Sequence, residues 1–105
     1  MEFIETSAFT KYVSDLLPGD EYRELQSFLI VRPDAGPVIP GSGGLRKLRW
    51  AGSGRGKRGG TRVIYYWVTT QERLYMLYIY PKNAQEDLTD KQLKFLRTIV
   101  ESEFG

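Results

Sequence analysis

The sequence predicts an α+β fold in which an antiparallel sheet of three to four strands is combined with an N-terminal helical hairpin and a C-terminal helix. Two observations predict it. Apolar residues recur at helical spacing near both ends of the chain, and two long runs of β-branched and aromatic residues lie between them. Because the chain has 105 residues, we expect a single domain over residues 1–105 with one modest core.

Two helices are expected in the first third of the chain. Apolar side chains at positions i, i+3, i+4 and i+7 predict a first helix over about residues 7–17, with Thr6 or Ser7 as its N-cap. The tripeptide Pro18-Gly19-Asp20 breaks this helix, and its aspartate can cap a second helix that Pro33 ends. The two helices together form a hairpin.

The predicted strands differ in strength. Phe3-Ile4 can form a short first strand. After a connecting loop over residues 33–44 that is rich in proline and glycine, residues 45–51 alternate as a strand with one basic face. Residues 61–69 and 73–80 are β-branched and aromatic runs joined by a short turn, so they are predicted as an antiparallel hairpin.

The C-terminal helix has the clearest local signal. Thr89 as N-cap and Gln92 three residues later form a capping box, and Leu88 and Leu93 form a hydrophobic staple around it. We expect this helix to pack, together with the helical hairpin, on one face of the sheet. That arrangement leaves the other face unexplained.

The composition excludes several chemistries. The chain has neither cysteine nor histidine, so a thiol nucleophile, an imidazole base and zinc sites built from these residues are ruled out. No secretory leader is recognised, and the longest apolar run, residues 63–68, is far shorter than the ~20 residues of a membrane helix. We expect a cytoplasmic protein that needs no membrane, metal or cofactor and whose catalysis uses Lys, Arg, Tyr or carboxylates.

Charge is distributed very unevenly along the chain. The stretch from Ala35 to Gln71 carries seven of the 15 basic residues and no acidic one, whereas all 13 acidic residues lie outside it. Like charges crowded in this way favour a polyanionic partner. The alternative is a basic surface loop that is merely solvated.

A glycine loop concentrates part of this charge. Gly54-Arg55-Gly56-Lys57-Arg58-Gly59 matches the dinucleotide pattern G-x-G-x-x-G, but a strand and not a helix follows, and the Walker pattern fails as well. What remains is a loop that can approach phosphates closely, beside strands with further basic residues. The basic residues of the loop and strands are Arg55, Lys57 and Arg58, and Lys47, Arg49 and Arg62. A mobile basic hairpin tip is the alternative interpretation.

Large aromatic rings lie on both faces of the predicted hairpin, Tyr66 and Tyr80 among them. Rings on an uncovered face can stack on unpaired bases, although a core position is the alternative for any single tyrosine. Lys82 follows the last strand and comes close to Arg62 if the two long strands pair.

These features together resemble the RelE/ParE superfamily of bacterial toxin–antitoxin systems, most closely the HigB-type RelE toxins. Three blocks carry the resemblance, and they are specific only in combination. They are Gly43-Gly44-Leu45-Arg46-Lys47-Leu48-Arg49, Gly54-Arg55-Gly56-Lys57-Arg58-Gly59-Gly60-Thr61-Arg62-Val63-Ile64-Tyr65-Tyr66, and Tyr78-Ile79-Tyr80-Pro81-Lys82-Asn83 with Asp87-Leu88-Thr89.

The resemblance implies a ribosome-dependent mRNA endoribonuclease in which the 2′-hydroxyl of the RNA attacks the adjacent phosphodiester without a metal. Arg62 matches the arginine that stabilises the phosphate, and Lys82 is a candidate general acid. The other residues that the resemblance places in catalysis are Lys47, Arg49 and Lys57, and a lysine base would need its pKa lowered by the neighbouring cations. The residues expected to bind RNA are Arg46, Arg55, Arg58, Tyr66 and Tyr80.

The partners implied are mRNA, the ribosome and a cognate antitoxin, with a HigA-like helix-turn-helix antitoxin expected. Operator DNA would be contacted only through that antitoxin. Two alternatives stay open: a ParE-like inhibitor of DNA gyrase, which shares the fold but not the chemistry, and a non-catalytic RNA-binding module.

Overall fold

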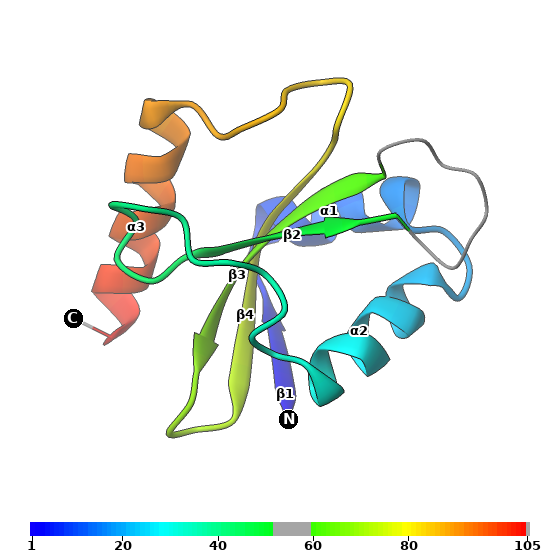
Figure 1. The fold of residues 1–105 in the computed structure, drawn as a ribbon, viewed down its shortest axis with the longest axis horizontal. Coiled ribbons are helices and arrows are strands. Elements are labelled where there is room, and N and C mark those ends of the chain that lie inside the picture. Colours follow the sequence, from blue (N-terminus) through cyan, green and yellow to red (C-terminus); the bar gives the residue numbers. More distant parts are fainter. Residues whose placement is uncertain (52–59, 105) are drawn as a thin grey trace.

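The computed structural model describes residues 1–51 and 60–104, and these form a four-stranded sheet with three α-helices (Figure 1). In chain order the elements are β1 (Glu2–Glu5), α1 (Ser7–Leu16), α2 (Glu21–Val31), β2 (Arg46–Trp50), β3 (Thr61–Val68), β4 (Arg73–Pro81) and α3 (Asp90–Phe104). Each predicted helix and strand is present within a residue or two of its expected bounds.

The sheet is mixed, and the expectation of a purely antiparallel sheet is wrong at one edge. The strand order is β1-β4-β3-β2, and the pairs β2–β3 and β3–β4 are antiparallel. β1 pairs parallel to β4, with Phe3 opposite Leu74. A hairpin dictates antiparallel pairing, but β1 and β4 are separated by most of the chain, so no short turn fixes their relative direction.

The helices cover both faces of the sheet, which corrects the expectation that all three pack on one face. Helices α1 and α2 lie on one side of the sheet and α3 on the other (Figure 1). On the first side Phe9 and Leu25 pack with Tyr65, and on the second Leu96 packs with Ile64. The α3 face is therefore a second core, and it accounts for the aromatic side chains on that side of the hairpin.

A β-bulge in β4 adjusts which side chains reach the α3 face. Ile64 is opposite Tyr78 and Tyr65 is opposite Met76, so Leu77 is an extra residue on β4. Leu77 and Tyr78 consequently both belong to the core beneath α3. Beyond the bulge, Tyr80 also lies on this face.

Capping at α1 and α3 follows the sequence signals, whereas capping at α2 does not. Phe9 N donates to Thr6 Oγ1 at 3.1 Å, and the same hydroxyl donates to Leu77 O at 2.7 Å, which joins the start of α1 to β4. At α3 the reciprocal capping bonds between Thr89 and Gln92 are both made, at 3.0 and 3.1 Å. Asp20 occupies the N-cap position of α2 but makes no capping bond with its side chain.

Candidate active site

A row of functional side chains crosses three strands on the α3 face of the sheet. Arg49 of β2 is the register partner of Arg62 of β3, and Arg62 is in turn the partner of Tyr80 of β4. Lys47 lies two residues before Arg49 and therefore on the same face. We call Lys47, Arg49 and Arg62 the basic cluster; three residues predicted from the sequence are thus brought together by strand pairing.

Arg62 is the most enclosed member of the basic cluster. Its side chain is only 4% exposed, and Nη2 donates to Glu86 Oε1 at 3.3 Å. Nη2 of Arg49 lies 3.8 Å from the same carboxylate oxygen. Because a buried charge is tolerated only with a charged or hydrogen-bonding partner, Glu86 balances the guanidinium that β3 places inside the fold.

Lys47 has a carboxylate partner of its own. Its ammonium group donates to Asp87 Oδ1. This hydrogen bond and the positive charge of Lys47 lower the pKa of the Asp87 carboxyl, so Asp87 is ionised at neutral pH. Glu86 and Asp87, which we call the acidic pair, therefore lie directly on the basic cluster.

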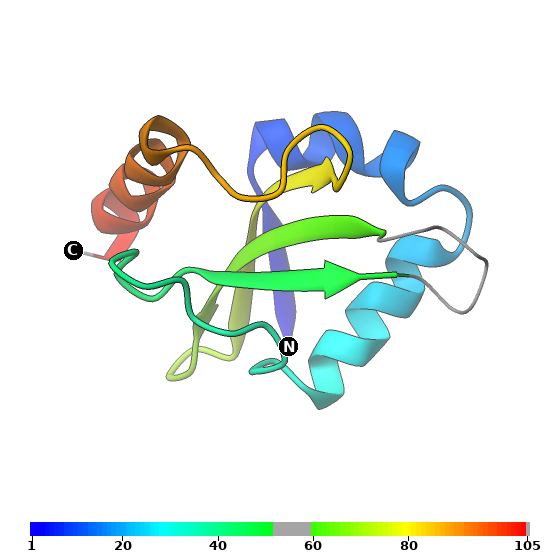
Figure 2. The same cartoon turned by 45° about the horizontal axis from the view of Figure 1, so that its top comes forward.

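The acidic pair is positioned by the connection from β4 to α3, which Figure 2 shows running from the end of β4 to the first turn of α3. The hydroxyl of Tyr80 donates to Glu86 O at 3.4 Å, and Nε2 of Gln85 donates to Asp87 O at 2.8 Å. Gln85 also donates to Gln92 in the capping box of α3. Sequence reasoning missed both carboxylates; the signal available was an acidic pair shortly after the last strand.

The ring of Tyr80 is buried, and its hydroxyl is the part of the side chain that contacts the acidic pair. The residue is 3% exposed, so its ring takes the core position that the sequence left open as the alternative to base stacking. Burial, followed by the negative charge of Asp87, raises the pKa of Tyr80 to about 12. The phenol is thus a hydrogen-bond donor at neutral pH. Tyr66 is half-buried against the core beneath α3.

Arg46 lies apart from the basic cluster. Its position in β2 has the parity of Leu48, which faces α1 and α2. Its guanidinium donates to Gly36 O at 2.8 Å and to Asp34 O at 3.2 Å, and it stacks over the ring of Trp67. These contacts tie β2 to the preceding loop, so the structure gives Arg46 a local structural role and does not place it beside Arg62.

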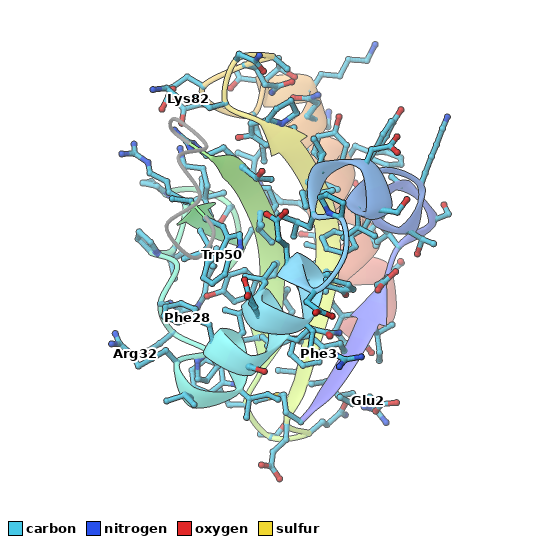
Figure 3. The ribbon with its side chains drawn as sticks, turned by 90° about the vertical axis from the view of Figure 1, so that its right-hand side faces the viewer. Glu2, Phe3, Phe28, Arg32, Trp50 and Lys82 are labelled. Carbon is cyan, nitrogen blue, oxygen red and sulfur yellow. The ribbon has the colours of Figure 1, made fainter. Side chains whose placement is uncertain are left out.

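Lys82 lies at the far end of the sheet from Glu2 (Figure 3). Its main-chain N donates to Gly60 O at 3.3 Å, beside the start of β3. With Asp15 and Asn83 it lines an open cavity of about 510 Å³. The remaining predicted residues, Arg55, Lys57 and Arg58, lie outside the described residues.

A family model for the RelE toxin of the RelE/RelB toxin–antitoxin system matches residues 40–104, which is more than half of the chain. The chain belongs to the RelE toxin family. The match contains β2, β3, β4 and α3, and therefore the basic cluster and the acidic pair. RelE toxins act in toxin–antitoxin systems and are generally endoribonucleases that cleave mRNA.

Metal-binding clusters and membrane-spanning helices are both absent from the described residues of this RelE-family chain. In residues 1–51 and 60–104, no group of three or more acidic side chains is gathered as a metal site would need. Among the same residues, no helix is both long and apolar enough to cross a membrane.

Proposed function

We propose that this RelE-family protein is a ribosome-dependent mRNA endoribonuclease that inhibits translation in the cytoplasm. The observation that carries the proposal is the buried guanidinium of Arg62 beside Arg49, on the face of β2 and β3 that also holds Lys47. A fixed cluster of positive charge is what stabilises the extra negative charge of a pentacoordinate phosphorane. The family supports the general activity, and the cluster supports the position of the scissile phosphate.

The proposed reaction is transesterification within the RNA. The 2′-oxygen forms a bond to phosphorus while the bond from phosphorus to the 5′-oxygen breaks, which leaves a cyclic phosphate and a free 5′-hydroxyl. A base takes the proton of the 2′-hydroxyl, and an acid gives a proton to the departing 5′-oxygen. We assign phosphorane stabilisation to Arg62 and Arg49, and Lys82 is the candidate acid.

Lys47 and Lys57 remain the lysines proposed for the base or for phosphate binding. Lys47 carries a carboxylate partner, Asp87, in the free protein. Among the predicted RNA contacts, we retain Arg55 and Arg58 for the polyanionic backbone. Tyr80 acts as a positioning residue, because its hydroxyl holds the main chain of Glu86.

The partner that neutralises this toxin is proposed to be an antitoxin encoded with it. Toxin–antitoxin membership supports an antitoxin in general. We propose the HigA-like helix-turn-helix kind, in keeping with the HigB-like sequence blocks, and contact with operator DNA only through it.

The test is primer extension on a defined mRNA loaded on 70S ribosomes. Wild-type protein is expected to produce cuts that need the ribosome, and Arg62→Gln is expected to lose them by about 10²-fold or more. Arg32→Gln is the matched control, since Arg32 is an exposed arginine at the end of α2 that pairs with Asp34. Circular dichroism of each variant checks folding.

Two outcomes of this primer-extension experiment would contradict the proposed function. No cuts from folded wild-type protein would reject the endoribonuclease, and a supercoiling assay would then separate a gyrase inhibitor from an inert RNA binder. Cuts of equal yield without ribosomes would reject ribosome dependence alone.

A further inference from the structure

We propose that the acidic pair is an internal competitor for RNA: in the free protein Glu86 and Asp87 occupy the anion-binding positions of the basic cluster, and an RNA phosphate must displace them. The inference rests on the proposed function in that RNA is taken as the ligand. It adds a regulatory contact within the same site.

The contacts are those a phosphate would make. One oxygen of Glu86 lies 3.3 Å from Arg62 and 3.8 Å from Arg49, so a single carboxylate bridges arginines from two adjacent strands. Asp87 accepts from Lys47, the third cation of the cluster. Guanidinium pairs of this kind bind phosphate and carboxylate through the same donors. Two carboxylates thus engage all three cations.

The order of exposure places the carboxylates outside two of the three cations, Arg62 and Lys47. The side chains of Arg62 and Lys47 are 4% and 18% exposed, whereas those of Glu86 and Asp87 are 53% and 71% exposed. A ligand that approaches these two cations from solvent therefore meets negative charge first. Juxtaposed like charges oppose association, so the acidic pair lowers the affinity for any polyanion.

The contacts of Glu86 can be exchanged. Charge-assisted hydrogen bonds between nitrogen and carboxylate usually measure about 2.7–2.9 Å, and both distances from Glu86 to the arginines are longer. The main chain of Glu86 is held separately, by the Tyr80 hydroxyl at 3.4 Å. Rotation of the Glu86 side chain can therefore release this carboxylate from Arg62 and Arg49 while the Tyr80 contact to the main chain is kept.

This arrangement favours RNA that is already held in place. Free RNA in solution must displace both carboxylates with its own binding free energy. A phosphate presented at high effective concentration, as on a ribosome, displaces them at far lower bulk concentration. The acidic pair thereby reduces binding to unattached RNA.

The test measures binding without cleavage. A short single-stranded RNA with every 2′-hydroxyl methylated cannot undergo the reaction, and its Kd is measured by fluorescence anisotropy at fixed salt. Glu86→Gln and Asp87→Asn are each expected to lower the Kd by up to about fivefold, the range of an exposed ion pair. Glu101→Gln is the control, because Glu101 pairs with Arg97 within α3 and not with the basic cluster.

Glu86→Asp separates contact from net charge. It keeps the charge but shortens the side chain, so it is expected to tighten RNA binding as Glu86→Gln does. An unchanged Kd in Glu86→Asp, or equal effects of Glu86→Gln, Asp87→Asn and Glu101→Gln, would overturn the proposal. Loss of the carboxylate that pairs with buried Arg62 could unfold the Glu86 variants, and thermal unfolding measures whether it does. In that case Asp87→Asn, which leaves the Arg62 contact in place, tests the proposal.

The result is independent of the cleavage assay. If wild-type protein cuts no mRNA while the Glu86 and Asp87 variants still bind the methylated RNA more tightly, the nuclease is rejected and the internal competitor is kept. If wild-type protein cuts mRNA but the Kd is the same in all variants, the nuclease is kept and the internal competitor is rejected.

Discussion

Arg62 of β3 and Tyr80 of β4 are cross-strand partners whose side chains are both buried on the α3 face of the sheet. They hold Glu86 from two sides: Arg62 binds its carboxylate, and the Tyr80 hydroxyl binds its main-chain oxygen. In the free protein, two neighbouring strands of the sheet thus contact both the side chain and the main chain of Glu86. The predictions below address this pair, the cluster around it and the core that supports it.

Ionisation of Tyr80 is expected to destabilise the protein at alkaline pH. Its pKa is about 12 in the folded protein, raised from 10.0, because burial disfavours the phenolate. The unfolded chain releases this proton first, so the contribution to stability is full below pH 10 and is lost between pH 10 and about 12. The Tm measured from pH 8 to 12 should fall less steeply in Tyr80→Phe than in wild type.

The control for this experiment is Tyr12→Phe, since Tyr12 is exposed on α1. That variant should follow the wild-type curve. If Tyr80→Phe also follows it, burial of the Tyr80 phenol does not perturb its ionisation.

Arg49 is expected to contribute one phosphate contact. Its side chain is largely exposed at the outer edge of the basic cluster, so Arg49→Gln should weaken binding of the methylated RNA and reduce the slope of log K against log salt by about 0.7. Titrations at several salt concentrations measure the slope. Arg32→Gln should leave it unchanged, and an unchanged slope in Arg49→Gln would remove Arg49 from the RNA interface.

Local signals in the sequence predicted local structure well. The capping box of Thr89 and Gln92 depends on residues three apart, and both of its bonds are made. The shared face of Lys47 and Arg49 follows from strand alternation alone. The antiparallel pairing of β2 with β3 then places Arg62 beside Arg49.

Features that depend on distant residues were not predicted. The direction of β1 and the face that α3 covers depend on contacts between elements far apart in the chain. The pairing of Arg62 with Glu86 spans 24 positions and that of Lys47 with Asp87 spans 40. No periodicity in the sequence records such pairs, and the burial of Tyr80 beneath α3 depends on long-range packing of the same kind.

The loop before β2 is expected to depend on the hydroxyl of Tyr65. This buried group donates to Pro33 O at 2.7 Å and accepts from Gly36 N at 2.9 Å. Tyr65→Phe leaves the buried amide of Gly36 without that acceptor, which costs about 1–3 kcal/mol in the free energy of unfolding. Urea denaturation measures the loss. Tyr12→Phe should change the value by under about 0.5 kcal/mol, and an equal effect of both variants would contradict the structural role of the hydroxyl.

The contact between Lys47 and Asp87 is expected to persist in mild acid. The hydrogen bond and charge of Lys47 lower the pKa of Asp87 below 3.8, so the carboxylate stays ionised in the folded protein at a pH where an ordinary aspartate takes up a proton. Its contribution to stability is present above the ordinary pKa and is lost as the pH falls through the lowered one. Carbon-13 NMR of the Asp87 carboxyl group should show an inflection below 3.8 in wild type. Lys47→Gln should move that inflection upward, whereas an inflection that stays in place would show that Lys47 does not hold Asp87 in solution.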